Sequence, residues 1–173
     1  MTHFVTWRGL DEWRAESATV ELADDGLKAT GTQLGADYRL DYRLDASANF
    51  VTRSIEIVAV GQGWERTLEL RHDGRGGWTG ADGVAGALDC DLALSPLTNA
   101  MPIRRSGLHR SEGAADFLMA WIEVPSLRVH ASAQRYEHVR PGVVRYVDDG
   151  FSAELELDAD GLVVRYPGLA ERV

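Results

Sequence analysis

The segment from Leu94 to Arg105 holds the densest group of side chains that could do chemistry in this chain. Its sequence is Leu-Ser-Pro-Leu-Thr-Asn-Ala-Met-Pro-Ile-Arg-Arg. Two prolines bracket Thr98 and Asn99, and two adjacent arginines, Arg104 and Arg105, close it. A guanidinium group makes bidentate hydrogen bonds to carboxylate, phosphate or vicinal hydroxyl groups. One interpretation is therefore that Asn99 and one arginine bind the polar head of a ligand. The apolar side chains that would line a pocket beside it are Leu97, Met101 and Ile103.

A structural interpretation of the same segment competes with the functional one. Asn99 would then stabilise a proline-limited turn through its own backbone, as asparagine commonly does. Arg104 or Arg105 would pair with Asp89 or Asp91, which precede the segment. The residue types and their spacing are compatible with both interpretations.

Asp89 and Asp91 lie two residues apart on one face of a predicted strand, and such a pair of carboxylates could serve an enzyme. Glycoside hydrolysis needs two carboxyl groups about 5–5.5 Å or about 6.5–9.5 Å apart. Residues two apart on a strand are separated by about 6.5–7 Å, so the spacing permits this chemistry. Carboxylates that alternate along a strand usually form a solvated face, which is the expectation for this pair. A hydrolase acting on a glycoconjugate, using these aspartates with Arg104 or Arg105, is therefore the alternative function.

The remaining reactive residue types give no signal for a metal, a cofactor or a nucleophile. The five histidines are scattered without the spacing of metal ligands. Cys90 is the only cysteine, which excludes an intramolecular disulfide. Its apolar strand position predicts a buried side chain. We therefore expect no metal, no cofactor and no catalytic residue.

Tryptophan is frequent, with five residues in 173. Its large flat ring suits contact with sugar rings or acyl chains, so Trp78 and Trp121 are candidate ligand contacts. The structural alternative is that these rings fill the hydrophobic core. Trp121 lies within the apolar run 117–124, which predicts that its ring is buried.

These residues must be positioned by β-strands. Asp-Gly occurs five times and Pro-Gly twice, and both dipeptides favour tight turns between antiparallel strands. Apolar and polar residues alternate between the turns, as expected for strands with one buried face. The alternating windows are Tyr38–Asp45, Trp64–Arg71, Leu88–Leu94, Leu127–Gln134 and Phe151–Leu157. Hairpins are expected over 64–78 and 151–166. Helical signal is weak and is confined to 9–18 and 107–116.

The chain is therefore predicted to form one all-β domain over residues 1–173, built from ten or more short, mostly antiparallel strands. A meander of this length must curl, because twisted open sheets with many strands close, split or roll up. Its apolar face either packs on a second layer or folds around an interior that leaves room for a ligand.

Charge and hydropathy exclude several classes of partner. The 18 basic and 27 acidic residues give a formal charge of −9, which disfavours binding to nucleic acid or to an anionic membrane surface. Lys28 is the only lysine. No run approaches the ~20 apolar residues of a membrane span, and the first ten residues do not resemble a signal peptide. We therefore expect a cytoplasmic protein without integral membrane association.

Three stretches together resemble the bacterial glycolipid-binding protein family. They are Leu88-Asp-Cys-Asp-Leu92, the string Ser95–Arg105 and Tyr166-Pro-Gly-Leu169. The stretch 38–53 and the Gly77-Trp78 turn are also similar, so that the resemblance covers nearly the whole chain. The Ser-Pro-x-Thr-Asn-x-x-Pro-Ile-Arg-Arg string is long and unusual, and therefore specific.

The resemblance implies a strongly curved, mostly antiparallel sheet with little helix, forming an incomplete or open barrel similar to lipoprotein-carrier folds. It brings no catalytic residues. The matched polar positions, which are candidate ligand contacts, are Asp91, Thr98, Asn99, Arg104 and Arg105. We therefore predict a non-enzymatic protein that binds an amphipathic small molecule, a glycolipid, in the apolar interior of the sheet. A third hypothesis is an interaction scaffold that forms a homodimer through exposed strand edges.

Overall fold

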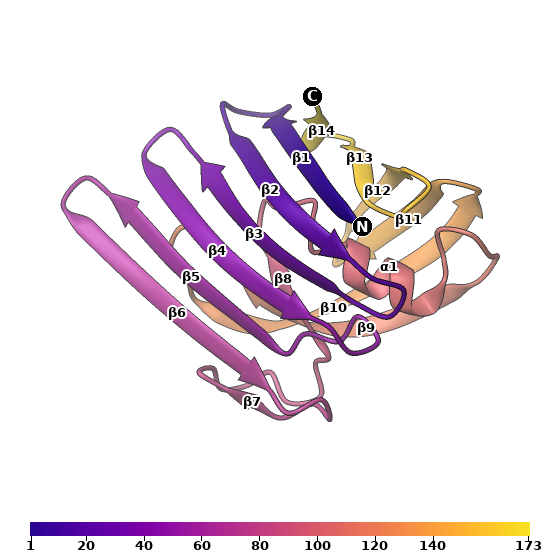
Figure 1. The fold of residues 1–173 in the computed structure, drawn as a ribbon, viewed down its shortest axis with the longest axis horizontal. Helices are drawn as coiled ribbons and strands as arrows, with labels where there is room; N and C mark the ends of the chain where they lie inside the picture. Colours follow the sequence, from indigo (N-terminus) through magenta and orange to yellow (C-terminus); the bar gives the residue numbers. More distant parts are fainter.

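The computed structural model describes residues 1–173 and contains fourteen strands and one short helix (Figure 1). The strands are β1 (Thr2–Gly9), β2 (Ala15–Leu22), β3 (Leu27–Leu34), β4 (Tyr38–Ala46), β5 (Ser54–Gly61), β6 (Trp64–His72), β7 (Trp78–Thr79), β8 (Asp89–Leu92), β9 (Ala114–Ile122), β10 (Val129–Arg140), β11 (Val143–Asp148), β12 (Phe151–Leu157), β13 (Val163–Tyr166) and β14 (Ala170–Arg172), and the helix is α1 (Ala100–Ser106).

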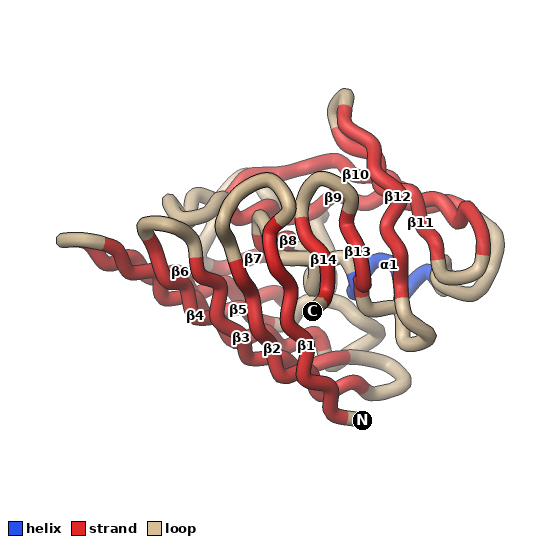
Figure 2. The backbone as a smooth tube through the Cα atoms, turned by 90° about the horizontal axis from the view of Figure 1, so that it is seen from above, coloured by secondary structure: helices blue, strands red, loops and turns tan.

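All strands belong to one sheet that rolls up without closing. Its order is β7-β6-β5-β4-β3-β2-β1-β14-β13-β12-β11-β10-β9-β8, and every pair is antiparallel except β8 with β9. Cys90 and Leu92 of β8, at one end of this order, pack in the same core cluster as Ile55 and Ile57 of β5, near the other end. The predicted curved, mostly antiparallel and incompletely closed sheet is confirmed, and Figure 2 shows the curl from above.

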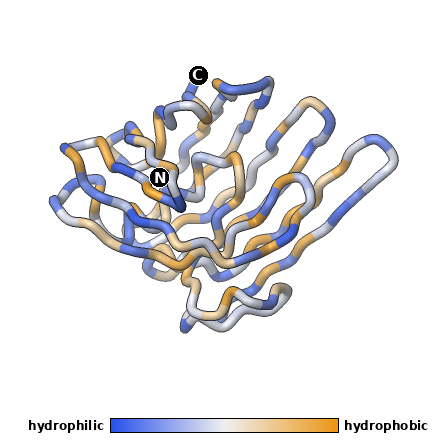
Figure 3. The backbone as a smooth tube through the Cα atoms, turned by 180° about the vertical axis from the view of Figure 1, so that it is seen from behind, coloured by the Kyte–Doolittle hydropathy of each residue, from blue (hydrophilic) through white to orange (hydrophobic).

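The alternation of residue types places one face of each strand in the core. In β4, Leu40, Tyr42 and Leu44 are buried, and Arg39 and Arg43 on the other face are exposed. Figure 3 shows the same alternation of hydropathy along neighbouring strands. The predicted hairpins are also present, as β6–β7 and β12–β13.

Two sequence expectations about local structure are wrong. The weak helical signal over 9–18 corresponds to a turn between β1 and β2, because both strands gain full ladders of pairing with their neighbours. In β10 the expected faces are inverted: Gln134 is buried, whereas Ala131 and Ala133 are exposed. The inversion follows from partners on the concave side that hydrogen-bond the Gln134 amide.

The concave side of the sheet is filled by the chain itself. The segment Leu94–Arg105, termed the plug segment, contributes Leu97, Met101 and Ile103, each at most 1% exposed. It begins at Leu94 with a left-handed φ of 67°, and α1 is followed by Gly107 with φ 72°. Figures 1 and 2 place α1 within the curve of the sheet. No helix of the chain is long and apolar enough to span a membrane.

Candidate functional site

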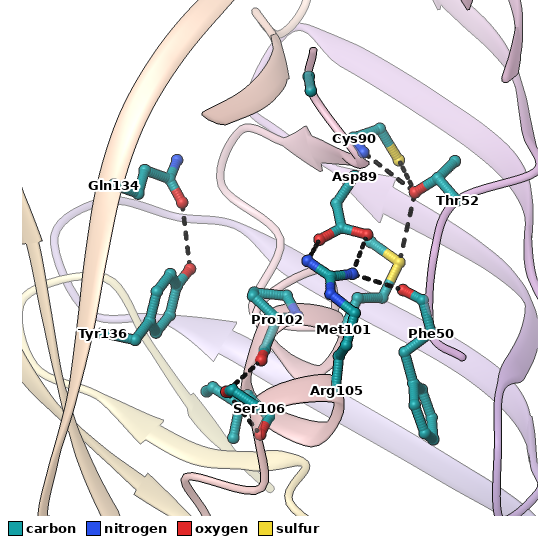
Figure 4. Close-up of polar contacts among 12 residues, drawn as sticks. Phe50, Thr52, Asp89, Cys90, Met101, Pro102, Arg105, Ser106, Gln134 and Tyr136 are labelled. Carbon is teal, nitrogen blue, oxygen red and sulfur yellow. Dashed lines mark hydrogen bonds and ion pairs between the residues drawn. The ribbon is translucent and has the colours of Figure 1, made fainter. Parts of the chain in front are cut away.

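The plug segment is fixed to β8 by a buried ion pair. Arg105 donates from its two terminal nitrogens to the two carboxylate oxygens of Asp89, at 2.7 and 2.6 Å (Figure 4). One of these nitrogens also donates to the carbonyl oxygen of Phe50 at 3.2 Å. Asp89 is fully buried, and this burial raises the pKa of its carboxyl, although Arg105 acts in the opposite direction. The predicted pairing of a motif arginine with an upstream aspartate is thus confirmed for Arg105.

Arg104 binds a different part of the sheet. Its guanidinium donates to the carbonyl oxygen of Asp160 in the turn between β12 and β13. The same group lies 4.8 Å from the centre of the Phe50 ring. Both motif arginines therefore hold α1 against neighbouring parts of the fold.

Asp91 is the centre of a buried polar network. One of its carboxylate oxygens accepts a hydrogen bond from the Thr98 hydroxyl at 2.8 Å, and the other accepts one from the Gln134 amide at 2.7 Å. Burial raises the pKa of Asp91. The expectation that Asp89 and Asp91 form a solvated strand face is wrong, because both side chains are buried and the plug segment and Gln134 supply their donors.

Asn99 joins the same network from the plug segment. Its amide donates to the hydroxyl of Tyr136 at 2.9 Å, and that hydroxyl donates to the Gln134 side-chain oxygen at 3.1 Å. The Asn99 side-chain oxygen is buried without a partner. Asn99 therefore binds a strand 37 residues away and not its own turn, which was the structural expectation. These contacts define the polar network: Asp91, Thr98, Asn99, Gln134 and Tyr136.

Another buried carboxyl anchors the start of the plug segment. One oxygen of Glu16 accepts hydrogen bonds from the hydroxyls of Tyr42 and Ser95, both at 2.7 Å. Its other oxygen has no hydrogen-bond partner. Burial is the main cause that raises the pKa of Glu16 to about 7.

The polar network extends toward the surface along β10. The Gln134 amide lies 3.4 Å from the Ser132 hydroxyl, which in turn lies 3.5 Å from a carboxylate oxygen of Asp148. The Tyr146 hydroxyl donates to the same oxygen at 3.1 Å. A continuous set of polar contacts therefore connects the plug segment with the end of β11.

An open groove lies where this set of contacts reaches the surface. We term it the β10 groove; its volume is about 620 Å³, and its lining consists of Trp121, His130, Ala131, Ser132, Ala133, Asp148 and Asp149. The indole of Trp121 and the imidazole of His130 are 4.7 Å apart at their centres. The pairing of β10 with β11 stops at Gln134 and Asp148, so residues 129–133 pair with β9 alone. The groove therefore offers an aromatic surface, a hydroxyl, carboxylates and a free strand edge.

A second groove of about 630 Å³ adjoins the first and shares Ala133, Asp148 and Asp149 with it. Phe117, Leu118 and Val147 give it a more apolar lining. The two grooves together present a polar, aromatic part and an apolar part, as an amphipathic ligand requires.

The predicted ligand contacts are thus divided among three places. Trp121 lines the β10 groove and is half-buried, which corrects the expectation of a fully buried ring. Trp78 lies apart from it: its ring packs at a tilt against His72, and its indole nitrogen donates to the Ala87 carbonyl oxygen at 2.9 Å. The other predicted contacts lie within or beneath the plug segment. They are Asp91, Thr98, Asn99, Arg104 and Arg105.

The sequence interpretation missed His130, Ser132, Gln134 and Asp148. His130, Ser132 and Gln134 have one local signal, an alternation that places polar side chains on one face of β10, and the sequence predicts that this face is exposed to solvent. Asp148 lies on β11 and has no such signal. Their proximity to the motif depends on contacts over 43 residues of sequence, as between Asp91 and Gln134.

Comparisons with known proteins identify a family and a solved structure with a similar fold. A family model described as "Putative glycolipid-binding" matches residues 4–172. The chain is also similar to the crystal structure of a DUF1089 family protein from Pseudomonas aeruginosa, with 31% sequence identity and a TM-score of 0.80. That similarity covers 96% of this chain and 95% of the other. No curated protein matches the chain.

Proposed function

The chain belongs to the glycolipid-binding family whose model spans it, and from this premise we propose that it binds a glycolipid without turnover in the β10 groove and the adjoining groove. The observation that carries the proposal is that the adjacent rings of Trp121 and His130 line an open groove together with Asp148. Polar contacts through Ser132 and Gln134 connect this groove to the plug segment.

The interior of the sheet is an unfavourable binding site for the ligand. Leu97, Met101 and Ile103 occupy it, and burial of each such side chain stabilises the fold by roughly 1.5–3 kcal/mol. A ligand that displaced them would also have to separate Arg105 from Asp89. We therefore place the ligand at the surface grooves and not in the interior.

Each groove suits one part of an amphipathic ligand. A sugar ring stacks on the Trp121 indole, and its hydroxyls donate to Asp148 and accept from Ser132, as expected for aromatic and polar groups that converge in one groove. The acyl part extends along Phe117, Leu118 and Val147.

The burial of the paired aspartates favours binding over hydrolysis. Asp89 is held by Arg105, and Asp91 is held by Thr98 and Gln134, so neither carboxyl lines a groove. A hydrolase needs one such group in contact with the substrate. The hydrolase alternative therefore has less support than simple binding.

A calorimetric titration of delipidated protein tests the proposal. The probe is n-octyl β-D-glucoside below its micelle concentration, and dihexanoylphosphatidylcholine is the amphiphile without a sugar. We expect saturable binding of the glucoside and at least a tenfold loss, about 1.4 kcal/mol, in Trp121→Ala. Trp13→Ala removes an equally large ring that is exposed elsewhere, and it should bind like the wild type. Absence of saturable glucoside binding, equal binding of both amphiphiles, or an equal loss in the two variants would contradict the proposal.

A further inference from the structure

A third groove, of about 610 Å³, lies on the face of β1–β5 that points away from the plug segment. Its floor is made of hydroxyl side chains from three neighbouring strands: Thr6, Ser17, Thr19, Thr30 and Thr32. None of them is part of the polar network or of the grooves beside β10. The solvated face of an antiparallel sheet is polar, and Asp41, Arg43 and Glu56 line the same groove as these hydroxyls.

The strand register arranges these hydroxyls in rows across the sheet. Ser17 is directly opposite Thr6 on one side and Thr32 on the other, and Thr19 is opposite Thr30. Neighbouring strands are about 4.8 Å apart, so the hydroxyls repeat at about that interval. The Thr6 and Ser17 hydroxyls are 2.9 Å apart, and the Thr32 hydroxyl donates to a carboxylate oxygen of Asp41 at 2.6 Å. The hydroxyls of Thr19 and Thr30, and the unused lone pairs of the other three, are available to a ligand.

The two ends of the hydroxyl floor differ in chemistry. Phe4 lies opposite Thr19 at one end, and its ring is 83% exposed. At the other end Arg43 lies opposite Thr30 and Glu56. The groove therefore has an aromatic platform at one end and charged hydrogen-bonding groups of both signs at the other.

These features select one class of ligand. An acyl chain would remove the Thr19 and Thr30 hydroxyls from water without giving them hydrogen-bond partners, at a cost in free energy. An anionic polymer would be repelled by a chain with a formal charge of −9. An uncharged saccharide meets both conditions, because its hydroxyls donate and accept and its ring faces stack on an aromatic side chain.

We propose that the outer face of β1–β5 is a second binding surface, which takes an uncharged oligosaccharide laid across the strands with one ring on Phe4. The five strands span about 19 Å, which is long enough for several linked sugar rings. This proposal is independent of the β10 groove and could hold if glycolipid binding there failed.

The test is an NMR titration of ¹⁵N-labelled protein with uncharged hexasaccharides: maltohexaose, cellohexaose and laminarihexaose. We expect one of them to shift the amide signals of β1–β4. The isosteric pair of changes Thr19→Val and Thr30→Val keeps strand-forming side chains and should weaken binding at least fivefold, as should Phe4→Ala. Thr67→Val, on exposed β6 outside the groove, should not change binding.

Trp121→Ala separates this surface from the β10 groove, because it should leave hexasaccharide binding unchanged. No shift with any hexasaccharide up to about 10 mM, which is weaker than about 3 kcal/mol of binding, would overturn the proposal. Shifts confined to residues 130–133 and 148–150 would overturn it too, as would unchanged binding in the double valine variant.

Discussion

The side-chain amide of Gln134 donates a 2.7 Å hydrogen bond to the carboxylate of Asp91, although 43 residues separate the two in sequence. This contact joins β10, which borders the open groove, to β8, which lies under the plug segment. The plug segment therefore acts as internal support for the groove, and its polar side chains bind residues of β8 and β10.

Replacement of Gln134 by leucine tests this support. The change leaves one buried oxygen of Asp91 without its donor and removes the acceptor of the Tyr136 hydroxyl. We therefore expect a loss of about 1–3 kcal/mol in the free energy of unfolding. Urea denaturation followed by far-UV circular dichroism measures it. Ala131→Ser, an exposed change on the same strand, is the control. Equal stability of Gln134→Leu and the control would contradict the network.

Arg105→Ala should be among the most destabilising single changes in the chain. It leaves the buried carboxylate of Asp89 unpaired, which costs about 3–5 kcal/mol in comparable cases. Arg128, which is largely exposed and paired with Glu123, provides a matched arginine, and its change to alanine should cost far less, because solvent screens an exposed ion pair. Thermal unfolding monitored by calorimetry compares the two variants, and similar melting temperatures would refute the prediction.

Glu16 should make stability depend on pH. Burial disfavours the charged form of its carboxyl and raises the pKa from the ordinary value of 4.5 to about 7 in the folded protein. The folded state therefore binds the proton more tightly, and the stabilisation is fully present below pH 4.5 and lost as the pH rises through 7. The shift corresponds to about 3 kcal/mol.

Glu16→Gln removes this ionisation and keeps a side chain of the same shape. The difference in unfolding free energy between the variant and the wild type should move in favour of the variant as the pH rises from 4.5 to above 7. Urea denaturation at pH 5, 6, 7 and 8 gives this difference. A difference that stays constant over the series would show that Glu16 does not titrate there.

Cys90 should be inert in the folded protein. Its side chain is wholly buried, and burial raises the pKa of the thiol to about 12, so very little nucleophilic thiolate is present at neutral pH. We expect labelling by a thiol-specific chromogenic disulfide only at the rate of unfolding. Rapid labelling without denaturant would contradict this burial.

The fold could be predicted from the sequence further than the site could. The alternation in Tyr38–Asp45 and the turns at Asp-Gly report local backbone preferences, and they identify strands and hairpins correctly. The burial of Asp89 and Asp91 could not be read in this way, because it depends on a separate segment folding back over β8. The alternation in β10 likewise predicts a solvent-exposed Gln134, because its hydrogen bond to Asp91 is made across distant parts of the chain.

The partly exposed ring of Trp121 is a second case in which a local sequence pattern does not report burial. The apolar run around it predicts burial, but the pairing of β10 with β11 stops before reaching it, so one side of the ring stays open. Where a sheet ends depends on the register of distant strands, which a local pattern does not report.

The most direct test of the central claim is the position of a bound glycolipid. In ¹H–¹⁵N correlation spectra titrated with n-octyl β-D-glucoside, we expect the largest shifts at amides of residues 130–133 and 148–150, with the amides of Leu97, Met101 and Ile103 unchanged. Shifts concentrated in the plug segment would show that the ligand enters the interior of the sheet, which would contradict the account.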